Sequence, residues 1–419
     1  MRPQKIHTKT IIIIGVIIFA ILAIVWAMFW YYNQYISSLN NQSTQTTTTN
    51  SPLLPTLTDN TTDTFTSSPT ETTLSTNSIL DNLNNVETYD PATEILQGAK
   101  VVTLEDKPIA GYTILSKQLS TSSPKQVVAR YVLKTTGEMI DYDVIAGSKS
   151  SLNTFKPGKT EQALFSKNGD YVVLQSDNKG EIISRLVYVP TNSTYALDTD
   201  ITSIDFLDNG NLVYGVKKGD GYSVKMVDIN TKKAKELAVL QMTEWTLENA
   251  GGNIVRATFK PSGYAEGVAL AIDIRNGTIT NDVKPVIGLT PKRTSDNKYV
   301  LLSEGGIGYN KLLFMKRSTQ DIFSLNANTF LEKCAREVLK GGVLCAVPEK
   351  LDKQAVYPDT WYKNLTNTKD KLVYKSLTST SSRLVYGFGG ANVSVTNLSL
   401  TNVGIFFQDT QTLGLYTIR

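Results

Sequence analysis

Histidine limits the chemistry open to this chain, because the sequence holds a single one, His7. We expect His7 to lie in a short tail ahead of a membrane helix, which leaves the rest of the chain without an imidazole. Ser-His-Asp and Cys-His mechanisms, the His-Glu-x-x-His zinc motif and every histidine-ligated metal site are then excluded there. The sequence also lacks a Gly-x-Ser-x-Gly elbow, a Walker loop and a dinucleotide-binding fingerprint. We therefore expect no cofactor and no metal.

Carboxylate-only chemistry remains open. A glycosidase needs two Asp or Glu side chains about 5 to 10 Å apart. Asp141, Asp143, Asp205 and Glu244 are candidates, but their spacing does not pair them. Most of these acids fit turns or solvated strand ends.

The sequence favours neither calcium binding nor nucleic-acid binding. Asp198, Asp200 and Asp205 supply the hard oxygen ligands that Ca²⁺ prefers, but their spacing is not that of an EF-hand loop, and we interpret them as part of a plain turn between blades. Forty-two basic and 38 acidic residues give a net charge of +4. This near balance provides no basic surface for nucleic acid, and we expect none to bind.

The two cysteines are close enough in sequence to pair. If Val338 to Gly341 form a hairpin loop, Cys334 lies directly opposite Cys345 on the neighbouring strand. Opposed residues of antiparallel strands place their Cα atoms about 4.5 to 5.5 Å apart, within disulfide reach. We expect this bridge, with two buried free thiols as the alternative.

Aromatic residues provide the candidate contacts for a partner, because aromatic side chains are enriched in interface hot spots. Trp361 and Tyr362 lie in an irregular stretch between strand patterns, where binding residues are common. We take these two as the candidate binding residues. The alternative for them, and for Trp245, is packing in the core.

The elements that must hold these residues are repeated hairpins. One turn signal reads Phe165 to Leu174 around Asn168-Gly169, and recurs from Phe206 to Tyr214; weaker copies follow at 259–263 and 295–302. Asn-Gly pairs supply the positive φ angles of a tight two-residue hairpin. Gly305-Gly306-Ile307-Gly308 also fits a hairpin loop better than a phosphate-binding loop.

A second hairpin follows each of these by some twenty residues. Its turns lie at Asn192, Thr231, Asn276 and Ser318, so the unit recurs every 40 to 45 residues or so. Four strands at this period are typical of propeller blades. The sequence predicts an all-β, seven-bladed propeller over residues 96–419. Counts of six or eight blades, and a β-sandwich with coincidental spacing, are the alternatives.

The blades can be placed along the chain. Residues 101–145 form blade one, 160–326 hold blades two to five, and the cysteine hairpin with its following insertion belongs to blade six. The last blade holds 393–395, 404–407 and 413–418. A chain that ends on a strand favours closure of the ring by pairing of the terminal strands.

The repeats resemble the WD40-like repeats of TolB-type bacterial propellers, without the Trp-Asp dipeptide of eukaryotic WD40 repeats. The run from Glu332 to Pro348, followed by Asp359-Thr360-Trp361-Tyr362, is similar to single-pass, membrane-anchored bacterial surface propellers. The resemblance implies architecture and location over about residues 95–419, and it carries over no catalytic residue.

The N-terminal region reads as an anchor and a stalk. Residues 11–32 are uncharged and mostly apolar, which is long enough to span a membrane as a helix. Cations at 2, 5 and 9 place residues 1–10 in the cytoplasm and the C-terminal domain outside. Residues 33–95 are rich in Thr, Ser and Asn, as in a disordered stalk. A cleaved signal peptide is the alternative to the anchor.

These observations predict a binding or scaffold module without enzymatic activity, held outside the cell membrane. Its partner would be a protein, peptide or glycan of the envelope. A surface glycosidase that depends on carboxylates is the competing hypothesis, and a purely structural role in a surface layer is a third.

Overall fold

The computed structural model describes residues 96, 98–117, 126–152, 158–401 and 403–419. The predicted tail (1–10), membrane helix (11–32) and stalk (33–95) lie outside these ranges, so these predictions stay predictions. Within the described ranges, no helix is long and apolar enough to cross a membrane.

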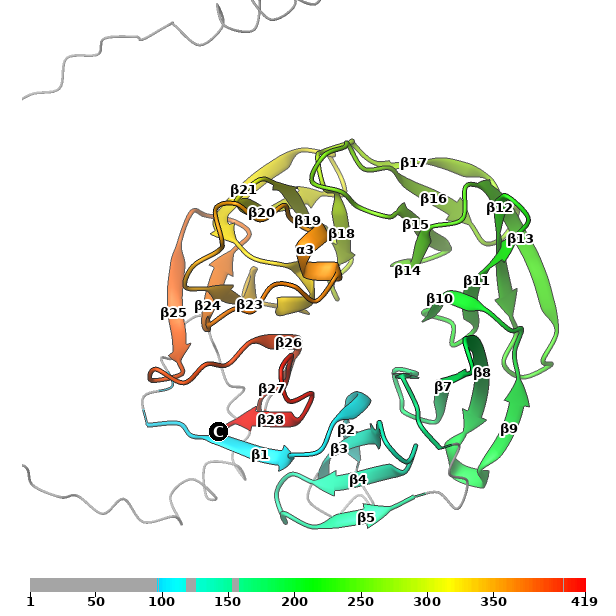
Figure 1. Cartoon of the computed structure of the whole chain (residues 1–419), viewed down its shortest axis with the longest axis horizontal. Helices are drawn as coiled ribbons and strands as arrows, with labels where there is room; N and C mark the ends of the chain where they lie inside the picture. The colour runs from blue at the N-terminus through cyan, green and yellow to red at the C-terminus, as the bar shows by residue number, and fades with distance from the viewer. Residues whose placement is uncertain (1–95, 97, 118–125, 153–157, 402) are drawn as a thin grey trace, which may run out of the picture. The chain divides into compact units, whose positions relative to one another are not determined.

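The described residues form seven four-stranded antiparallel sheets, arranged radially around a central axis (Figure 1). The predicted all-β, seven-bladed propeller is confirmed. Each blade is named by its strands in order from the axis outward.

The strands have the following bounds. Blade one is β2 (Ile109–Lys117), β3 (Gln126–Leu133), β4 (Met139–Asp143) and β5 (Lys149–Ser151). Blade two is β6 (Gln162–Phe165), β7 (Tyr171–Asn178), β8 (Glu181–Tyr188) and β9 (Ser193–Ala196). Blade three is β10 (Ile201–Phe206), β11 (Leu212–Lys218), β12 (Gly221–Val227) and β13 (Ala234–Gln241). Blade four is β14 (Trp245–Gly251), β15 (Ile254–Phe259), β16 (Ala269–Asp273) and β17 (Ile279–Val283).

The remaining blades follow the same plan. Blade five is β18 (Thr290–Arg293), β19 (Tyr299–Gly306), β20 (Tyr309–Lys316) and β21 (Ile322–Asn328). Blade six is β22 (Cys334–Leu339), β23 (Gly342–Pro348), β24 (Asp370–Ser376) and β25 (Ser382–Gly387). Blade seven is β26 (Val395–Thr401), β27 (Gly404–Asp409), β28 (Leu415–Ile418) and, as its outer strand, β1 (Val101–Glu105).

The ring closes through β1, as the strand at the chain's end predicted. Val101 pairs with Ile418 and Thr103 with Tyr416. The assignment of residues 101–104 to blade one was therefore wrong. The short link at Asp106–Pro108 is not a hairpin turn within one blade: it carries the chain from the outer edge of blade seven to the inner strand of blade one.

The turn signals located the hairpins but not their turn type. Asn168-Gly169 lies between β6 and β7, and only the glycine has a positive φ, of 74°. Ser166 N–H donates to Tyr171 O, so the loop is longer than the two residues predicted. The copy assigned to 259–263 was also wrong, since these residues end β15 and enter its connection to β16.

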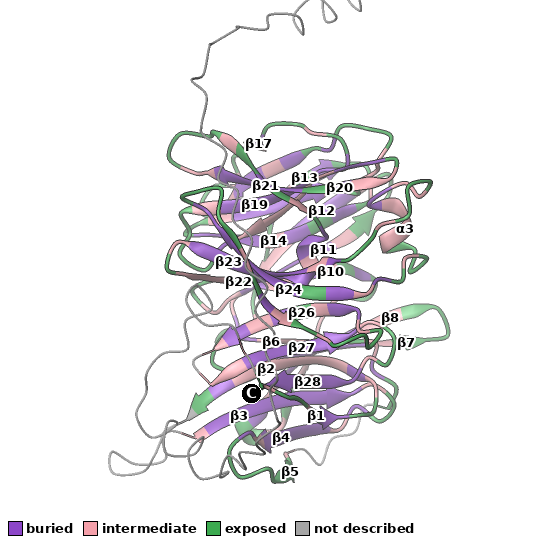
Figure 2. Cartoon of the chain, turned by 90° about the vertical axis from the view of Figure 1, so that its left-hand side faces the viewer, coloured by how far each residue is buried: buried purple, intermediate pink, exposed green. Residues whose placement is uncertain are grey.

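The strands are largely buried and most turns are exposed (Figure 2). Clusters of buried apolar side chains lie between neighbouring blades. At the closure, the fully buried Phe406 of blade seven shares a core cluster with Leu104 of β1 and Tyr131 of blade one. A buried ion pair adds to the contact between blades one and two. The Arg130 Nε and Nη2 atoms donate to Asp141 at 2.7 and 2.8 Å, and Nη1 donates to Gly169 O at 2.7 Å.

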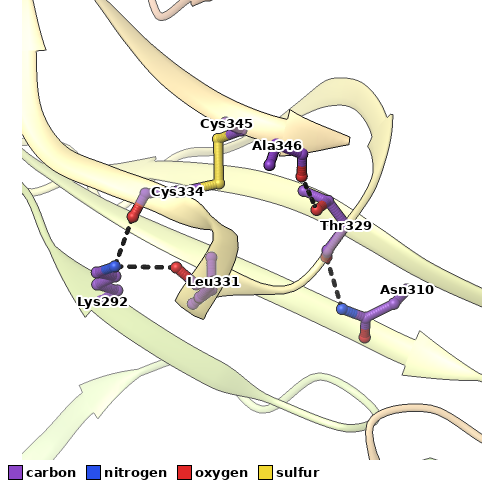
Figure 3. The surroundings of a disulfide bond; sticks show 7 residues. All are labelled: Lys292, Asn310, Thr329, Leu331, Cys334, Cys345 and Ala346. Atoms are coloured by element: carbon purple, nitrogen blue, oxygen red, sulfur yellow. Dashed lines mark hydrogen bonds between the residues drawn. A yellow bond between two sulfur atoms is a disulfide. The ribbon is translucent and has the colours of Figure 1, made fainter. Parts of the chain in front are cut away.

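The disulfide between Cys334 and Cys345 confirms the predicted pairing, with a Cα–Cα distance of 4.0 Å (Figure 3). The hairpin turn is tighter than expected, because Leu339 already pairs with Gly342. An irregularity in the register between Cys334 and Val338 restores the opposition of the two cysteines. The Lys292 amine fixes the same strand by donating to the carbonyls of Leu331 and Cys334, at 2.9 and 2.6 Å.

The closure makes Phe406 a test of ring stability. Replacing it with alanine should lower the free energy of unfolding by about 3–5 kcal/mol, because a large side chain is lost from a packed core. Phe323→Ala is the matched control, since Phe323 lies on the outer strand β21 and is 41% exposed. Chemical denaturation should show the larger loss for Phe406→Ala; equal losses would contradict the role assigned to the closure.

Candidate functional site

The candidate site is built around the insertion between β23 and β24. We call residues 349–369 the strap; it contains the short helix α3 (Asp359–Tyr362). The strap leaves blade six and lies against the β19–β20 turn of blade five. Tyr357 N–H donates to Gly306 O at 3.0 Å, Gly308 N–H donates to Ala355 O at 2.8 Å, and Val356 forms a β-bridge with Ile307.

The strap also reaches blade four. The Asp359 carboxylate accepts the Gly263 N–H at 2.6 Å and the Ser262 hydroxyl at 3.1 Å, both in the β15–β16 connection. Hydrogen bonds to a charged acceptor are among the stronger ones in proteins. A single loop therefore joins three consecutive blades on one face of the ring.

Glycines make room for the strap. A Cβ atom at Gly263 or at Gly305 would lie 2.3 Å from the Tyr357 carbonyl oxygen, and one at Gly308 would lie 2.6 Å from Lys353 O. The hairpin interpretation of residues 305–308 is confirmed. The glycines there also serve a purpose the sequence did not indicate, which is the close approach of another backbone.

The two predicted binding residues differ in their surroundings. The Trp361 ring stacks on Phe330, with centroids 4.3 Å apart and an interplanar angle of 6°, and the Lys333 amine lies 4.8 Å from its centroid. Tyr362 is 46% exposed and donates its hydroxyl to Glu332 at 2.7 Å. Trp245 is buried in the core, as its alternative interpretation expected.

Large apolar side chains are exposed on the face that carries the strap. Connections from the second to the third strand of a blade, and from one blade to the next, emerge on the same face because the strands alternate in direction. We call the seven exposed residues on these connections the apolar face: Met242, Tyr264, Val268, Ile287, Ile307, Tyr362 and Leu365.

The rest of the ring is different. The other exposed large hydrophobic residues among those described lie on outer strands or on a turn of the opposite face: Val101, Ile145, Val239, Ile279, Phe323 and Leu384. In the apolar face, Tyr264, Leu365 and Ile307 are 74, 73 and 63% exposed. Backbone hydrogen bonds tie the loops that carry them, from Gly288 N–H to Ala265 O and from Gly305 N–H to Ile287 O.

Two carboxylates on the inner strands are already bound by protein groups. Glu248 accepts the Arg293 N–H at 2.9 Å and the Arg256 Nη1 at 2.8 Å. Asp205 accepts the N–H groups of Asn249 and Phe206, both at 2.8 Å. Burial raises the pKa of Asp205. These contacts hold both carboxylates against neighbouring strands.

The other carboxylate candidates are dispersed. Asp141 is paired with Arg130, Asp143 accepts N–H groups within a turn, and Glu244 forms an exposed ion pair with Lys260. The three aspartates considered as calcium ligands are not gathered around one point: Asp198 pairs with Lys225, and among the described residues no three His, Cys, Asp or Glu side chains are grouped to hold a metal ion.

Solved structures share the fold. An oligogalacturonate lyase in complex with manganese matches 79% of this chain and 95% of its own, at 11% identity and a TM-score of 0.53. The fold is that of a β-propeller. TolB from Acinetobacter baumannii matches 73% of this chain and 62% of its own (10% identity, TM-score 0.40), and the tricorn protease 76% and 34% (11%, 0.49).

The chain thus spans about a third of the tricorn protease. At identities this low the likeness shows the fold alone, a propeller with TolB among its structural neighbours. No model of a protein family matches the sequence, and no curated protein matches it.

Sequence reasoning found the strap but missed most of the apolar face. Tyr264 was overlooked because residues 259–263 had been assigned to an inner turn. Leu365 follows the two predicted binding residues in the strap, and its side chain is more exposed than that of Tyr362. The length of these connections could have indicated the face. The β15–β16 connection and the strap are far longer than the equivalent two-residue turns of blades two and three, at Lys179-Gly180 and Gly219-Asp220.

The Asp359 contact should hold the strap in place. Asp359→Ala leaves the Gly263 N–H without its acceptor, and we expect a loss of about 1–3 kcal/mol in stability. Hydrogen–deuterium exchange should accelerate at Gly263 and across the strap. Asp352→Ala is the control, because the Asp352 side chain accepts an N–H within the strap itself, from Gln354. Unchanged exchange at Gly263 in the Asp359 variant would contradict this role.

An ion pair on the opposite face predicts a dependence on pH. Arg293 donates to both Asp208 oxygens at 2.9 Å and, with further hydrogen bonds from Asn249 and Gly252, lowers the pKa of Asp208 to about 2. A carboxyl whose pKa is lowered by folding stabilises the protein above its unfolded pKa, near 4, and loses that contribution as the pH falls toward 2. The difference in Tm between wild type and Asp208→Asn should therefore shrink between pH 6 and pH 2. A difference in Tm that stays constant over this pH range would contradict the role assigned to the ion pair.

Proposed function

We propose that this protein is a binding module without enzymatic activity, whose apolar face holds a polypeptide of the cell envelope. The observation that carries the proposal is the gathering of exposed apolar side chains on one face, over blades four to six. Single exposed hydrophobic residues are ordinary, whereas a group of them on a soluble domain marks an interaction surface.

The composition of the face favours a polypeptide over a glycan. Tyr264 and Tyr362 offer rings of the kind found in interface hot spots, and the Tyr264 hydroxyl adds a polar end that can donate a hydrogen bond. Ile287, Ile307 and Leu365 are aliphatic, which suits apolar side chains better than sugar hydroxyls.

The construction of the face supports binding as well. The Asp359 contacts and the bridge between Val356 and Ile307 fix the loops before any partner arrives. A surface ordered in advance loses less conformational entropy on association.

The inner strands support this proposal over a glycosidase. Such an enzyme needs one acid that can donate a proton and a second that is free to act as base or nucleophile. Asp205 and Glu248 are instead occupied by backbone N–H groups and arginines. The predicted membrane anchor and stalk would place the face outside the cell, within reach of an envelope component.

The apolar face can be tested by substitution in cells. In the triple variant Tyr264→Ser, Ile307→Ser, Leu365→Ser, crosslinking pull-downs from intact cells should recover any stoichiometric partner at least tenfold less well than wild type. The loss of three apolar contacts accounts for the drop.

A matched control separates this effect from general surface changes. The variant Val239→Ser, Ile279→Ser, Phe323→Ser alters exposed hydrophobic residues on outer strands and should leave recovery unchanged. Equal recovery with both variants, or the recovery of no envelope component by wild type, would overturn the proposal.

A further inference from the structure

A fully buried ion pair lies beneath the strap. Lys333 ends the 3₁₀ turn η2 (Leu331–Lys333), which joins blades five and six, and Asp370 is the first residue of β24. The Lys333 Nζ atom lies 2.6 Å from Asp370 Oδ2, and both side chains have zero exposure. Removing two charges from water in this way is costly.

Water is kept from the pair by aromatic rings. Trp361 covers the Lys333 amine at 4.8 Å from its ring centroid, and Phe330 stacks on the indole. The amine also lies 2.9 Å from Thr368 Oγ1, 2.9 Å from Val395 O and 3.2 Å from Ser394 Oγ. The two hydroxyls are hydrogen-bonded to each other at 2.9 Å.

The two oxygens of the Asp370 carboxylate differ. Oδ2 accepts the Val395 N–H at 2.7 Å as well as the lysine amine. Oδ1 is buried and has no hydrogen-bond partner among the described residues. A buried charged oxygen without a partner is destabilising, so the charged pair is incompletely compensated.

We propose that Lys333 and Asp370 become joined by an amide bond after folding, through the lysine Nζ and the aspartate Cγ. A proton passes from the ammonium to the carboxylate, and the neutral amine attacks Cγ. The C–N bond forms, the bond from Cγ to Oδ1 breaks, and Oδ1 leaves as water with two protons that come from the lysine. Ammonium plus carboxylate gives amide plus water, with no oxidation and no other reactant.

The groups around the pair indicate the role of each Lys333 and Asp370 atom in the reaction. Val395 N–H polarises the carboxyl group through Oδ2, which remains as the amide oxygen. Oδ1, without a partner, is the oxygen free to leave. The hydroxyls of Thr368 and Ser394 accept from the amine and hold it beside the carboxyl group. Once the C–N bond has formed, both carboxyl oxygens lie next to the nitrogen, and its protons pass from there to Oδ1. Burial lowers the pKa of Lys333, which favours the neutral amine that the attack needs.

Folding supplies the driving conditions. The two groups are held in contact, which makes the reaction effectively unimolecular. The product replaces two buried charges with a neutral amide, and the aromatic cover excludes the water that would hydrolyse it. The bond would anchor the end of the strap to the connection between blades five and six, and would enclose the Cys334–Cys345 disulfide within a larger covalent loop.

Mass spectrometry of the full chain, denatured and reduced, tests this directly. We expect wild type to be lighter than its sequence by one water molecule, and proteolysis to yield a branched peptide that joins Lys333 to Asp370 and survives both thiol reduction and hydroxylamine. Lys333→Arg should restore the full mass. Lys369→Arg, a change at a partly exposed lysine nearby, should keep the deficit.

Two results would overturn the proposal. One is wild type at full mass, with Lys333 and Asp370 recovered in separate peptides. The other is a deficit that maps elsewhere, such as a hydroxylamine-sensitive succinimide at Asp220-Gly221. Because wild type alone decides between these outcomes, the test stands even if a Lys333 variant does not fold.

Discussion

The pairing of β1 with β28 is the constraint on which the rest of the structure depends. Each blade of a propeller packs against two neighbours, so the first and last blades lack one of these contacts until the ring is closed. Closure here requires β1, a strand from the start of the domain, to complete the last sheet. The contact brings Leu104, Tyr131 and Phe406 into one core cluster between blades seven and one. Once the ring is closed, the connections between strands lie on two faces, and one of these is the apolar face.

The apolar face results from two long connections that meet above a short turn. The strap and the β15–β16 connection join through Asp359 and Gly263, above the β19–β20 turn of blade five. Glycines keep the backbones close, and the aromatic residues of the strap divide their roles. Trp361 turns inward over a buried ion pair, whereas Tyr362 remains partly exposed beside Leu365. The strap thus contributes both to the packing beneath it and to the apolar face at which we propose binding.

Local patterns predicted what local physics determines. The hairpin turns around Asn168 and Asn209 and the unit of four strands follow from turn chemistry and spacing. The opposition of Cys334 and Cys345 was predicted correctly although its hairpin loop was not, because a register irregularity offsets the tighter turn. The assignment of 101–104 failed because pairing across the closure leaves no trace in neighbouring residues. The β15–β16 connection was misplaced because its Ser-Gly pair imitates an inner turn.

The site was predicted less well than the fold, for a physical reason. Exposure of Tyr264 or Leu365 depends on how distant loops pack, and the burial of Lys333 with Asp370 depends on the strap folding over them. The alternation of apolar and polar residues predicts which face of a strand is buried, but it does not predict the contacts of an irregular loop. Trp361 and Tyr362 were chosen for their place outside regular strands, a criterion that located the segment without separating its inner from its outer residues.

A photo-reactive amino acid at Leu365, compared with one at Leu384, tests the central claim most directly. Both positions expose an apolar side chain, the first on the apolar face and the second on the outer strand β25. After irradiation of intact cells, the account predicts a discrete crosslinked adduct with an envelope polypeptide from Leu365 and none from Leu384. Adducts of equal yield from both positions, or none from Leu365, would contradict it.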